Sequence, residues 1–342
     1  MTQRSQRSNG LGCSDVALST VYDLAMVDLD GVVYVGADAV PGAADSLAGA
    51  QDNGMHLAYI TNNASRPPAK VAEHLRELGM PQVADTDVVN SAQAVAHLMA
   101  DALPADSAVL VVGGEGLLDA LADVGLRVVT RLDDNPAAVV QGFHPDIDWR
   151  QLAEASYAIQ SGLPWYASNT DLSVPTARGI APGNGSLVQA VANATGETPI
   201  VAGKPEAALF HETMARVGGE RPLMIGDRID TDIDGAIGVG IDSLAVLTGV
   251  TSLRELISLA PDHRPTYVSK DLGGVNEIHP PVQVEGTDAK CGSARASVDD
   301  GVLRLEGAGV ADTTGLRALI GLAWHHVDHS SARLELDGTL EA

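Results

Sequence analysis

The feature of this sequence that most constrains its fold is the alternation of short apolar runs with amphipathic segments. From Tyr22 onwards, DLAMVDLDG is followed by a segment that Pro41 opens, and then by HLAYITNN. Apolar runs of strand length that alternate with helix-length segments are the βαβ pattern of a parallel sheet. Residues 70–79 are predicted to form a helix, because apolar residues recur at i, i+4 and i+7 and Gly79 stands where a C-terminal cap is expected. The sequence therefore predicts an α/β fold.

The middle of the chain is expected to form an α/β unit of its own. Residues 108–114 and 137–143 are strand candidates, and the helix-like segment LLDALADVG lies between them. The later apolar runs TPIVAG, RPLMIGDR and IDSLAVLTGV are expected to rejoin the first sheet. After about Gly274 the pattern ends and a small ββαβ piece follows, with a turn at Asp300-Gly301. This piece is short for an independent core, so we expect it to pack on the main body or on a partner.

Acidic residues outnumber basic residues by a wide margin. Asp and Glu total 45 against 21 Lys and Arg, which gives a formal net charge of −24. Such a field repels phosphate backbones, so nucleic acid is not expected as a partner. The same field repels phosphorylated metabolites, and a phosphate site in this chain would therefore need a local cation.

The cysteines and the N-terminal residues indicate the cellular compartment of the protein. Cys13 and Cys291 are too few for a disulfide framework and have no metal-ligand spacing, which favours a reducing compartment. Residues 1–19 are polar and are predicted to be a disordered leader, since no apolar run typical of a signal peptide follows them. No segment has the length and hydropathy of a membrane span. We therefore expect a cytoplasmic protein that does not bind membranes.

Four polar segments each follow an apolar strand candidate, at the edge where open α/β sheets bind ligands. In the first, Asp28 and Asp30 would lie on one side of an extended chain. Two carboxylates about 4 Å apart repel each other, so a positive group should hold them. A helix N-cap or a turn is the alternative interpretation. The second segment, Thr61-Asn62-Asn63, offers a hydroxyl and amides to phosphate oxygens, or forms a loop turn.

The third and fourth segments add a cation and further carboxylates. Gly203-Lys204-Pro205 places an ammonium on a loop just before a helix, whose first residue is expected to be Pro205. The alternative is a solvated surface lysine. Asp227 follows the run PLMI and offers a carboxylate oxygen to Mg²⁺, with Asp232 close behind it. The alternative is a solvated acidic loop.

In this order and at these strand ends, the four segments resemble the signature of the haloacid dehalogenase superfamily. The stretches DLDGVVYVG, ITNN, WYASNTD, GKP and GDRIDTDI are similar to the branch with a large α/β cap between its second and third motifs. That branch comprises NagD-like, phosphoglycolate, pyridoxal phosphate and glycerol 3-phosphate phosphatases. The resemblance covers about residues 22–275. The N-terminal leader and the C-terminal piece have no counterpart in the minimal form of the family.

The resemblance implies a fold and a division into domains. The core would be a Rossmann-like, doubly wound parallel sheet, with an inserted α/β cap domain and a small C-terminal ββαβ appendage. The expected boundaries are 20–81 and 183–275 for the phosphatase core, 82–182 for the cap, and 276–342 for the appendage.

The resemblance also implies a mechanism. Asp28 would be the nucleophile and would form an aspartyl-phosphate intermediate. Asp30 would be the general acid and base, and it favours phosphate chemistry because dehalogenases of the superfamily lack an aspartate there. Mg²⁺ is the implied cofactor, bound by the carboxylates of Asp28 and Asp227 and by the backbone carbonyl of Asp30. Asp232 would orient Lys204 or a metal-bound water.

By the same resemblance, Thr61 and Lys204 would hold phosphate oxygens and Asn62 would assist near the nucleophile. The cap would read the rest of the substrate, and its polar candidates are Asn169 and Asp171. A turn or capping role is the alternative for these two residues.

The predicted activity is Mg²⁺-dependent hydrolysis of a small phosphorylated metabolite, with glycerol 3-phosphate as the favoured substrate. Phosphoglycolate, pyridoxal phosphate and nucleotides are alternative substrates. A module that senses phosphate ligands without turnover is an alternative function, against which the retention of Asp28, Asp30, Lys204 and Asp227 argues. Phosphotransfer to an acceptor other than water also stays open. A homodimer is compatible with the resemblance.

Overall fold

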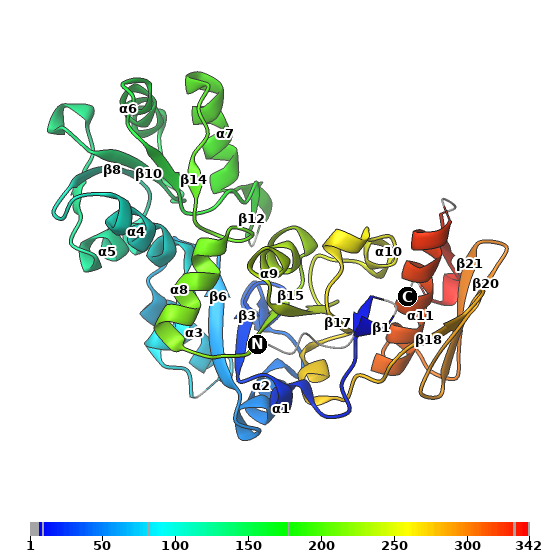
Figure 1. The fold of residues 1–342 in the computed structure, drawn as a ribbon. Helices are drawn as coiled ribbons and strands as arrows, with labels where there is room; N and C mark the ends of the chain where they lie inside the picture. The colour runs from blue at the N-terminus through cyan, green and yellow to red at the C-terminus, as the bar shows by residue number, and fades with distance from the viewer. Residues whose placement is uncertain (1–6, 9, 81, 177, 331–332, 341–342) are drawn as a thin grey trace. The chain divides into compact units, whose positions relative to one another are not determined.

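The structure is a computed structural model that describes residues 7–8, 10–80, 82–176, 178–330 and 333–340. The chain forms two compact units (Figure 1). Unit 1 comprises residues up to 58 and from 219 onwards, and unit 2 comprises residues 59–218. Among the described residues, no helix combines the length and the hydropathy that a membrane crossing requires.

A parallel sheet is at the centre of unit 1, and its strand order is β17-β16-β15-β3-β6-β7. Val27 pairs with Ile225, and Gly226 pairs with Ala245. Helices α2 and α9 lie on opposite faces of the sheet (Figure 1), which explains why its central strands β3 and β15 are mostly apolar and buried. The predicted α/β fold is confirmed. The strands are β3 (Leu24–Asp28), β6 (His56–Thr61, which leads into unit 2), β7 (Val88–Asn90, whose residues belong to unit 2), β15 (Pro222–Gly226), β16 (Asp242–Val246) and β17 (Tyr267–Ser269).

Short elements connect these strands within unit 1. The helix α2 buries Ala43, Leu47 and Ala50, which recur at helical spacing. The connecting elements are α1 (Leu18–Val21), β4 (Tyr34–Val35), β5 (Asp38–Ala39), α2 (Ala43–Asp52), η3 (Ile229–Ile233), α9 (Asp234–Val239), α10 (Leu253–Leu256), η4 (Pro261–His263) and η5 (Leu272–Asn276).

A five-stranded sheet and one long helix form the C-terminal part of unit 1. The order of its strands is β18-β19-β20-β21-β22. Two strands, β18 and β19, precede the predicted ββαβ piece and were not expected, because their polar residues give little apolar alternation. The elements are β18 (Gln283–Glu285), β19 (Asp288–Cys291), β20 (Ala294–Asp299), β21 (Val302–Glu306), α11 (Thr313–His329), β22 (Glu335–Leu336) and η6 (Gly338–Leu340).

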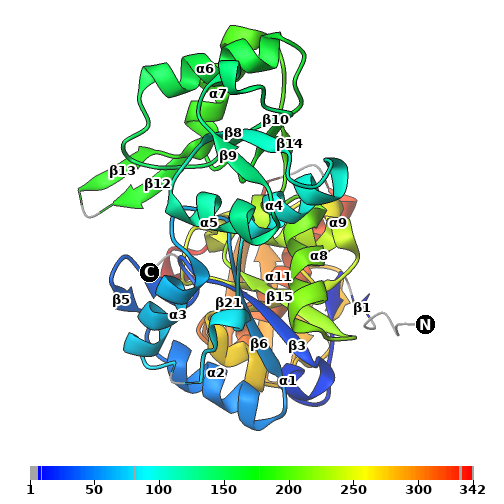
Figure 2. The ribbon, with the colours of Figure 1, turned by 90° about the vertical axis from the view of Figure 1, so that its left-hand side faces the viewer.

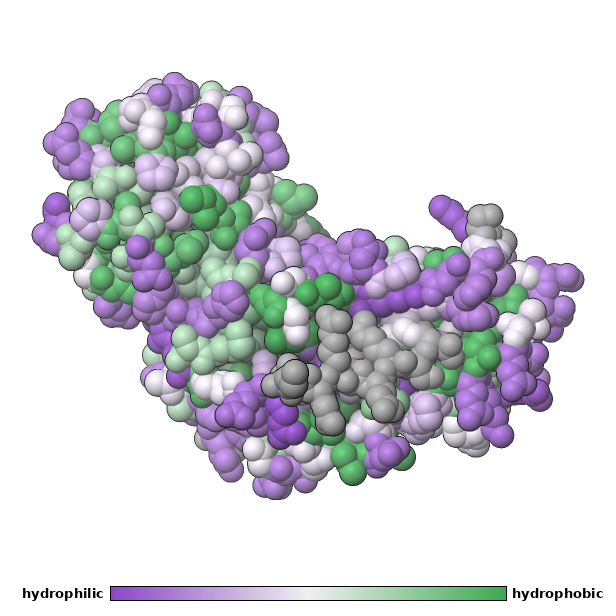
Figure 3. Space-filling view, in the orientation of Figure 1, coloured by the Kyte–Doolittle hydropathy of each residue, from purple (hydrophilic) through white to green (hydrophobic). Residues whose placement is uncertain are grey.

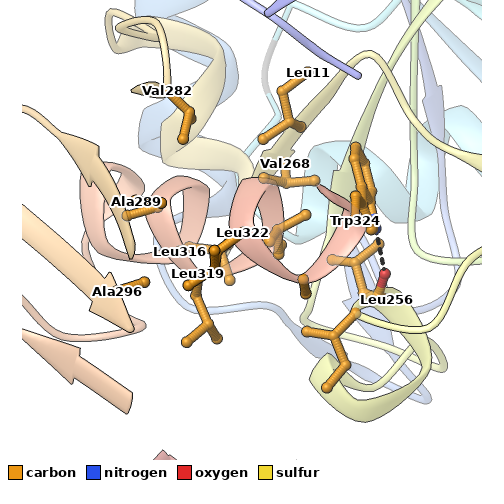
Figure 4. Close-up of a cluster of buried hydrophobic side chains, with 14 of the residues drawn as sticks. Leu11, Leu256, Val268, Val282, Ala289, Ala296, Leu316, Leu319, Leu322 and Trp324 are labelled. Atoms are coloured by element: carbon orange, nitrogen blue, oxygen red, sulfur yellow. Dashed lines mark hydrogen bonds between the residues drawn. The ribbon is translucent and has the colours of Figure 1, made fainter. Parts of the chain in front are cut away.

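One hydrophobic core joins this part to the parallel sheet (Figure 4). Leu319 and Leu322 of α11 lie in the same cluster as Val268 of β17. Trp324 is fully buried, and its Nε1 donates a hydrogen bond to the carbonyl of Leu256 at 2.8 Å. The outer surface over β20 and β21 is mostly hydrophilic (Figure 3). The C-terminal piece therefore packs on the main body, which was one of the two alternatives expected from its small size.

The segment from residue 10 to residue 19 is ordered, so the prediction of a disordered leader was wrong for these residues. Leu11 and Leu18 are fully buried. The backbone N–H of Gly12 donates to the carbonyl of Thr266 at 2.7 Å. Two isolated leucines in a polar stretch give no periodic signal, so the sequence could not reveal this packing. The short strands are β1 (Arg7–Ser8) and β2 (Leu11–Gly12), and residues 1–6 and 9 lie outside the described residues.

Unit 2 is built on a parallel sheet with the order β14-β11-β10-β8-β9. Helices α6 and α7 cover one face and α4 and α5 the other (Figure 2). The run TPIVAG forms β14, which pairs Ile200 with Tyr166 of β11. The expectation that this run rejoins the first sheet was wrong, because an apolar run does not specify its partner strand. The strands are β8 (Ala108–Val112), β9 (Arg127–Val129), β10 (Ala138–Gln141), β11 (Trp165–Ala167), β12 (Ser173–Thr176), β13 (Gly179–Pro182) and β14 (Ile200–Val201).

The helices of unit 2 begin and end where local chemistry predicts. The predicted helix at 70–79 is α3, and Gly79 follows its end with a φ of +97°. Asn90 caps α4 by accepting a hydrogen bond from the N–H of Gln93. The units divide at other positions than the predicted cap boundaries of 82 and 182, which stay a prediction. The helices are α3 (Pro68–Glu77), η1 (Asp85–Asp87), α4 (Ser91–Ala102), α5 (Glu115–Asp123), η2 (Leu132–Asp134), α6 (Trp149–Gln160), α7 (Asn184–Thr195) and α8 (Ala207–Val217).

A buried guanidinium, that of Arg317 on α11, ties the C-terminal part to the segments around it. It donates to the carbonyls of Gly12 at 2.7 Å and Pro280 at 2.8 Å, and its Nη1 lies 3.4 Å from Nδ1 of His279. Because a guanidinium can only donate, Nδ1 of His279 accepts, and Nε2 donates to the carbonyl of Gly274 at 2.8 Å. Burial, with the charge of Arg317 adding to it, lowers the pKa of His279 to about 4.

We predict that the buried, neutral His279 makes folding depend on pH. Its pKa is near the ordinary 6.5 in the unfolded chain and about 4 in the folded protein. Between these values only the unfolded chain takes up the proton, so stability is complete above about pH 6.5 and is lost as the pH falls towards 4. The full shift corresponds to about 3 kcal/mol. Urea unfolding at about pH 7.5 and about pH 5 should show a larger loss of unfolding free energy for the wild type than for His279→Gln.

A matched control is His211→Gln, because His211 is exposed on α8. This variant should keep the pH dependence of the wild type. Equal pH dependence in the wild type and in His279→Gln would contradict the prediction.

Candidate active site

Three buried carboxylates meet where two neighbouring strands of unit 1 end. Asp28 is the last residue of β3, and Asp227 directly follows β15. Because Val27 and Ile225 pair in the parallel register, the two carboxylates leave the sheet at the same edge. Oxygen atoms of Asp28, Asp227 and Asp232 all lie within 4.8 Å of one another, and the three residues are at most 9% exposed. We call these three residues the acidic cluster.

The backbone around the acidic cluster is shaped for carboxylates. A Cβ at Gly31 would lie 2.5 Å from Oδ2 of Asp227, and a Cβ at Gly249 would collide with the same oxygen. A Cβ at Gly226 would collide with Oδ2 of Asp232. Three glycines therefore make room for two carboxylates. Carboxylate oxygens grouped at this separation are the hard ligands that Mg²⁺ prefers, so the donor set fits a divalent cation.

Backbone groups hold Asp227 in place. The N–H of Val250 donates to Oδ2 of Asp227 at 2.6 Å, and the N–H of Thr251 donates to its carbonyl at 3.0 Å. Thr248 donates from its hydroxyl to the carbonyl of Gly31 at 2.6 Å, which ties this loop to the turn after β3. These residues were not predicted from the sequence. They could have been predicted, because the segment TGVT follows the apolar strand β16, just as the four polar segments with the predicted site residues follow apolar strands.

The other acidic residues of this loop have different partners. The guanidinium of Arg228 donates to both carboxylate oxygens of Asp230, at 3.0 and 2.7 Å, and this lowers the pKa of Asp230. Asp234 lies 2.7 Å from Nδ1 of His263. The structure therefore separates Asp227 and Asp232, which belong to the acidic cluster, from two acidic residues that form surface ion pairs.

Asp30 lies in a tight turn after β3 and is exposed. The N–H groups of Val33 and Tyr34 both donate to the carbonyl of Leu29, and the N–H of Gly31 donates to the carbonyl of Tyr34. Because β3 ends at Asp28, the alternation of an extended strand does not extend to Asp30. Its carboxylate is not a member of the acidic cluster, whereas exposure to solvent suits a group that exchanges protons.

In unit 2, hydrogen bonds join four of the predicted substrate-binding and phosphate-binding residues. The side-chain amide of Asn62 accepts from the N–H of Lys204 at 2.7 Å and donates to its carbonyl at 3.0 Å. Asn62 also donates to the carboxylate of Asp171 at 3.3 Å, and Asn169 donates to the carbonyl of Asn62 at 2.6 Å. Lys204, Asn62 and Asn169 are all buried. Thr61, at the end of β6, is buried as well.

The helix after Lys204 begins later than predicted. Pro205 lies in a turn, and α8 starts at Ala207 with Glu206 as its N-cap. The prediction that Pro205 is the first residue of the helix was therefore wrong. The turn instead brings the N–H of Glu206 to the carbonyl of Gly203 at 3.0 Å.

Two family profiles match separate parts of the chain. Residues 25–127 match the haloacid dehalogenase-like hydrolases, and residues 201–275 match a second profile described as HAD-hydrolase-like. The first match contains Asp28 and Thr61, and the second contains Lys204 and Asp227.

Proteins of known activity are also similar to this chain. A D-glycerol 3-phosphate phosphatase of Mycobacterium tuberculosis is 45% identical over 261 residues, which are 76% of this chain and 73% of that protein. An acid sugar phosphatase of Staphylococcus epidermidis is 36% identical over 253 residues, 73% of this chain and 95% of that protein.

A solved structure resembles the chain over almost its whole length. It is the glycerol phosphate phosphatase of Mycobacterium tuberculosis in complex with magnesium, with a TM-score of 0.82, 38% identity and coverage of 94% of both chains. The match therefore includes most of residues 276–342. It also confirms the predicted α/β core and the resemblance inferred from the sequence motifs. The chain belongs to the family of haloacid dehalogenase-like hydrolases.

Proposed function

We propose that this chain hydrolyses glycerol 3-phosphate with Mg²⁺ and passes the phosphate to water through an aspartyl-phosphate on Asp28. It is a phosphoric monoester hydrolase, and Mg²⁺ is its cofactor. The observation that carries the proposal is the acidic cluster at the edge where β3 and β15 end. The identity of 45% to a D-glycerol 3-phosphate phosphatase supports the choice of substrate.

The acidic cluster would hold the metal. Asp28 and Asp227 would bind it through their carboxylates and Asp30 through its backbone carbonyl, with Asp232 beside them. When bound, Mg²⁺ neutralises the negative charge that would otherwise keep the carboxylate of Asp28 away from a phosphate. The N–H of Val250 fixes one oxygen of Asp227, so a single orientation of this carboxylate is preferred.

The reaction needs two displacements at phosphorus. A carboxylate oxygen of Asp28 attacks the phosphorus, and the bond between phosphorus and the ester oxygen breaks. Asp30 gives its proton to the departing alkoxide. Asp30 then takes a proton from water as the water oxygen attacks the same phosphorus, the bond to Asp28 breaks, and inorganic phosphate leaves.

Thr61 and Lys204 would hold the phosphate. Thr61 offers a hydroxyl and Lys204 an ammonium, which provides the local cation that the net charge of −24 makes necessary. Residues 82–182 would form the cap that excludes water and selects small metabolites over proteins and nucleic acids. Two cysteines that form no disulfide are consistent with a reaction in the cytoplasm.

Phosphate release from glycerol 3-phosphate tests this function. With Mg²⁺ present, the wild type should turn over this substrate with a higher kcat/KM than phosphoglycolate, pyridoxal 5′-phosphate or hexose phosphates. Asp28→Asn should lose at least about 10³-fold in kcat, because the amide cannot act as the nucleophile.

The control for this prediction is Asp52→Asn, which makes the same chemical change at the exposed end of α2 and should keep full activity. A higher kcat/KM for another phosphomonoester would replace the proposed substrate. Tight binding of glycerol 3-phosphate without turnover by the wild type would indicate a sensor and contradict the proposed reaction.

Metal binding can be tested without turnover. Mg²⁺ at about 100 times its Kd should add about 2.7 kcal/mol to the free energy of unfolding of the wild type and raise its Tm. Asp227→Asn should lose most of this shift, because a neutral amide is a weaker ligand for a hard cation. Thermal unfolding with and without Mg²⁺ measures both effects.

Asp230→Asn is the matched control, since Asp230 lies in the same loop but pairs with Arg228. It should keep the Mg²⁺-dependent rise in Tm. An equal rise in Asp227→Asn and in the wild type would show that Asp227 does not bind the metal.

A further inference from the structure

The side chain of Asn62 forms hydrogen bonds with both backbone polar groups of Lys204. Its Oδ1 accepts from the N–H of Lys204 at 2.7 Å and its Nδ2 donates to the carbonyl of the same residue at 3.0 Å, although 142 residues separate the two. The N–H and the carbonyl of one residue are thus both bound by a single side-chain amide. This is a bidentate contact, which restrains the Lys204 backbone more than a single hydrogen bond would.

Other side chains hold Asn62 in turn. The backbone carbonyl of Asn62 accepts from Nδ2 of Asn169 at 2.6 Å and from the hydroxyl of Ser91 at 2.5 Å. Ser91 is the first residue of α4, and Asn169 follows β11. Both are buried, so the loss of either donor would leave the carbonyl of Asn62 with fewer partners in a place that water reaches poorly.

Asn184 continues the chain of hydrogen bonds. It is the first residue of α7, and its Nδ2 donates to the carbonyl of Asn169 at 2.7 Å. Hydrogen bonds between buried amides therefore link Asn184 to Asn169, Asn169 to Asn62, and Asn62 to Lys204. We call these three asparagines the amide relay.

The turn at Lys204 fits closely against this relay. A Cβ at Gly203 would lie 2.6 Å from the carbonyl oxygen of Ser168 and 2.7 Å from Oδ1 of Asn62. The N–H of Gly203 donates to the carbonyl of Ser168 at 2.7 Å. The backbone on both sides of the Lys204 side chain is therefore fixed.

We propose that the amide relay consists of positioning residues, and that Asn169 and Asn184 act on catalysis through Asn62 and Lys204 rather than by contact with the substrate. The inference rests on the proposed function, in which Lys204 holds a phosphate oxygen. A lysine ammonium stands on a flexible four-carbon stem, so the placement of its backbone limits where the charge can lie. The side-chain amide of Asn62 makes three such hydrogen bonds, and that of Asn169 donates to Asn62 and accepts from the N–H of Asp171 at 3.2 Å. In this proposal they hold the backbone in place, instead of binding the substrate as the sequence predicted.

A double-mutant cycle between Asn169 and Lys204 tests the relay. Asn169→Ala should lower kcat/KM for p-nitrophenyl phosphate about 10-fold to 100-fold and should weaken inhibition by inorganic phosphate by a similar factor. Asn169→Asp, which keeps the volume but loses the donor, should lose at least as much. In the Lys204→Met background, Asn169→Ala should change both values by less than about twofold, because the group that the relay positions is gone.

Two further measurements separate positioning from a general loss of structure. The Mg²⁺ concentration for half-maximal activity should be unchanged in Asn169→Ala, since the acidic cluster lies in unit 1. Asn184 is one hydrogen bond further from Lys204 than Asn169 is. Asn184→Ala should therefore lower kcat/KM by less than Asn169→Ala does, and this loss should also disappear in the Lys204→Met background. Asn193→Ala is the matched control, because Asn193 is exposed on α7, and it should behave like the wild type.

The outcomes distinguish this inference from the proposed function. If the wild type turns over phosphomonoesters and Asn169→Ala is equally active, the relay does not position Lys204. Equal losses from Asn169→Ala with and without Lys204 would also overturn it, because the effect would not pass through that residue. If the wild type releases no phosphate from any phosphomonoester, the proposed function fails, and this inference fails with it.

Discussion

The mutual repulsion of buried carboxylates at one edge of the sheet is the constraint on which the account of this protein depends. Asp28, Asp227 and Asp232 bring their oxygens within 4.8 Å of one another while almost inaccessible to solvent. Two unit charges at about 4 Å repel by about 4 kcal/mol at an effective dielectric of about 20. A divalent cation turns this repulsion into attraction and also reverses the sign of the field for an incoming phosphate. Folding thus maintains an arrangement that favours metal binding.

Few elements of the fold are needed to bring the carboxylates of the acidic cluster together. Neighbouring parallel strands end at the same edge, so the residues that follow β3 and β15 are brought together whatever their separation in the sequence. Glycines at the turns leave space for carboxylates, and backbone N–H groups of the loop after β16 orient Asp227. In unit 2, the side-chain amide of Asn62 binds the backbone of Lys204.

The sequence predicted the residues that stand at strand ends, because strand ends can be recognised from apolar runs. Asp28 and Asp227 were found in this way, and the α/β fold followed from the same pattern. Asp232 was expected beside the site and belongs to the acidic cluster itself, which depends on the π-helical turn at Ile229–Ile233. Partners that come from distant segments were not predictable. The pairing of β14 with β11, the burial of Leu11 and the contacts of Asn169 are set by tertiary packing, which leaves no periodic trace in the sequence.

The central claim is that Asp28 and Asp227 share one divalent cation. An anomalous difference map from crystals grown with Mn²⁺ in place of Mg²⁺ tests it most directly. We predict a peak between the carboxylates of these two residues, at about 2.0–2.3 Å from an oxygen of each. Crystals with full Mn²⁺ occupancy elsewhere and no peak between the two carboxylates would contradict it.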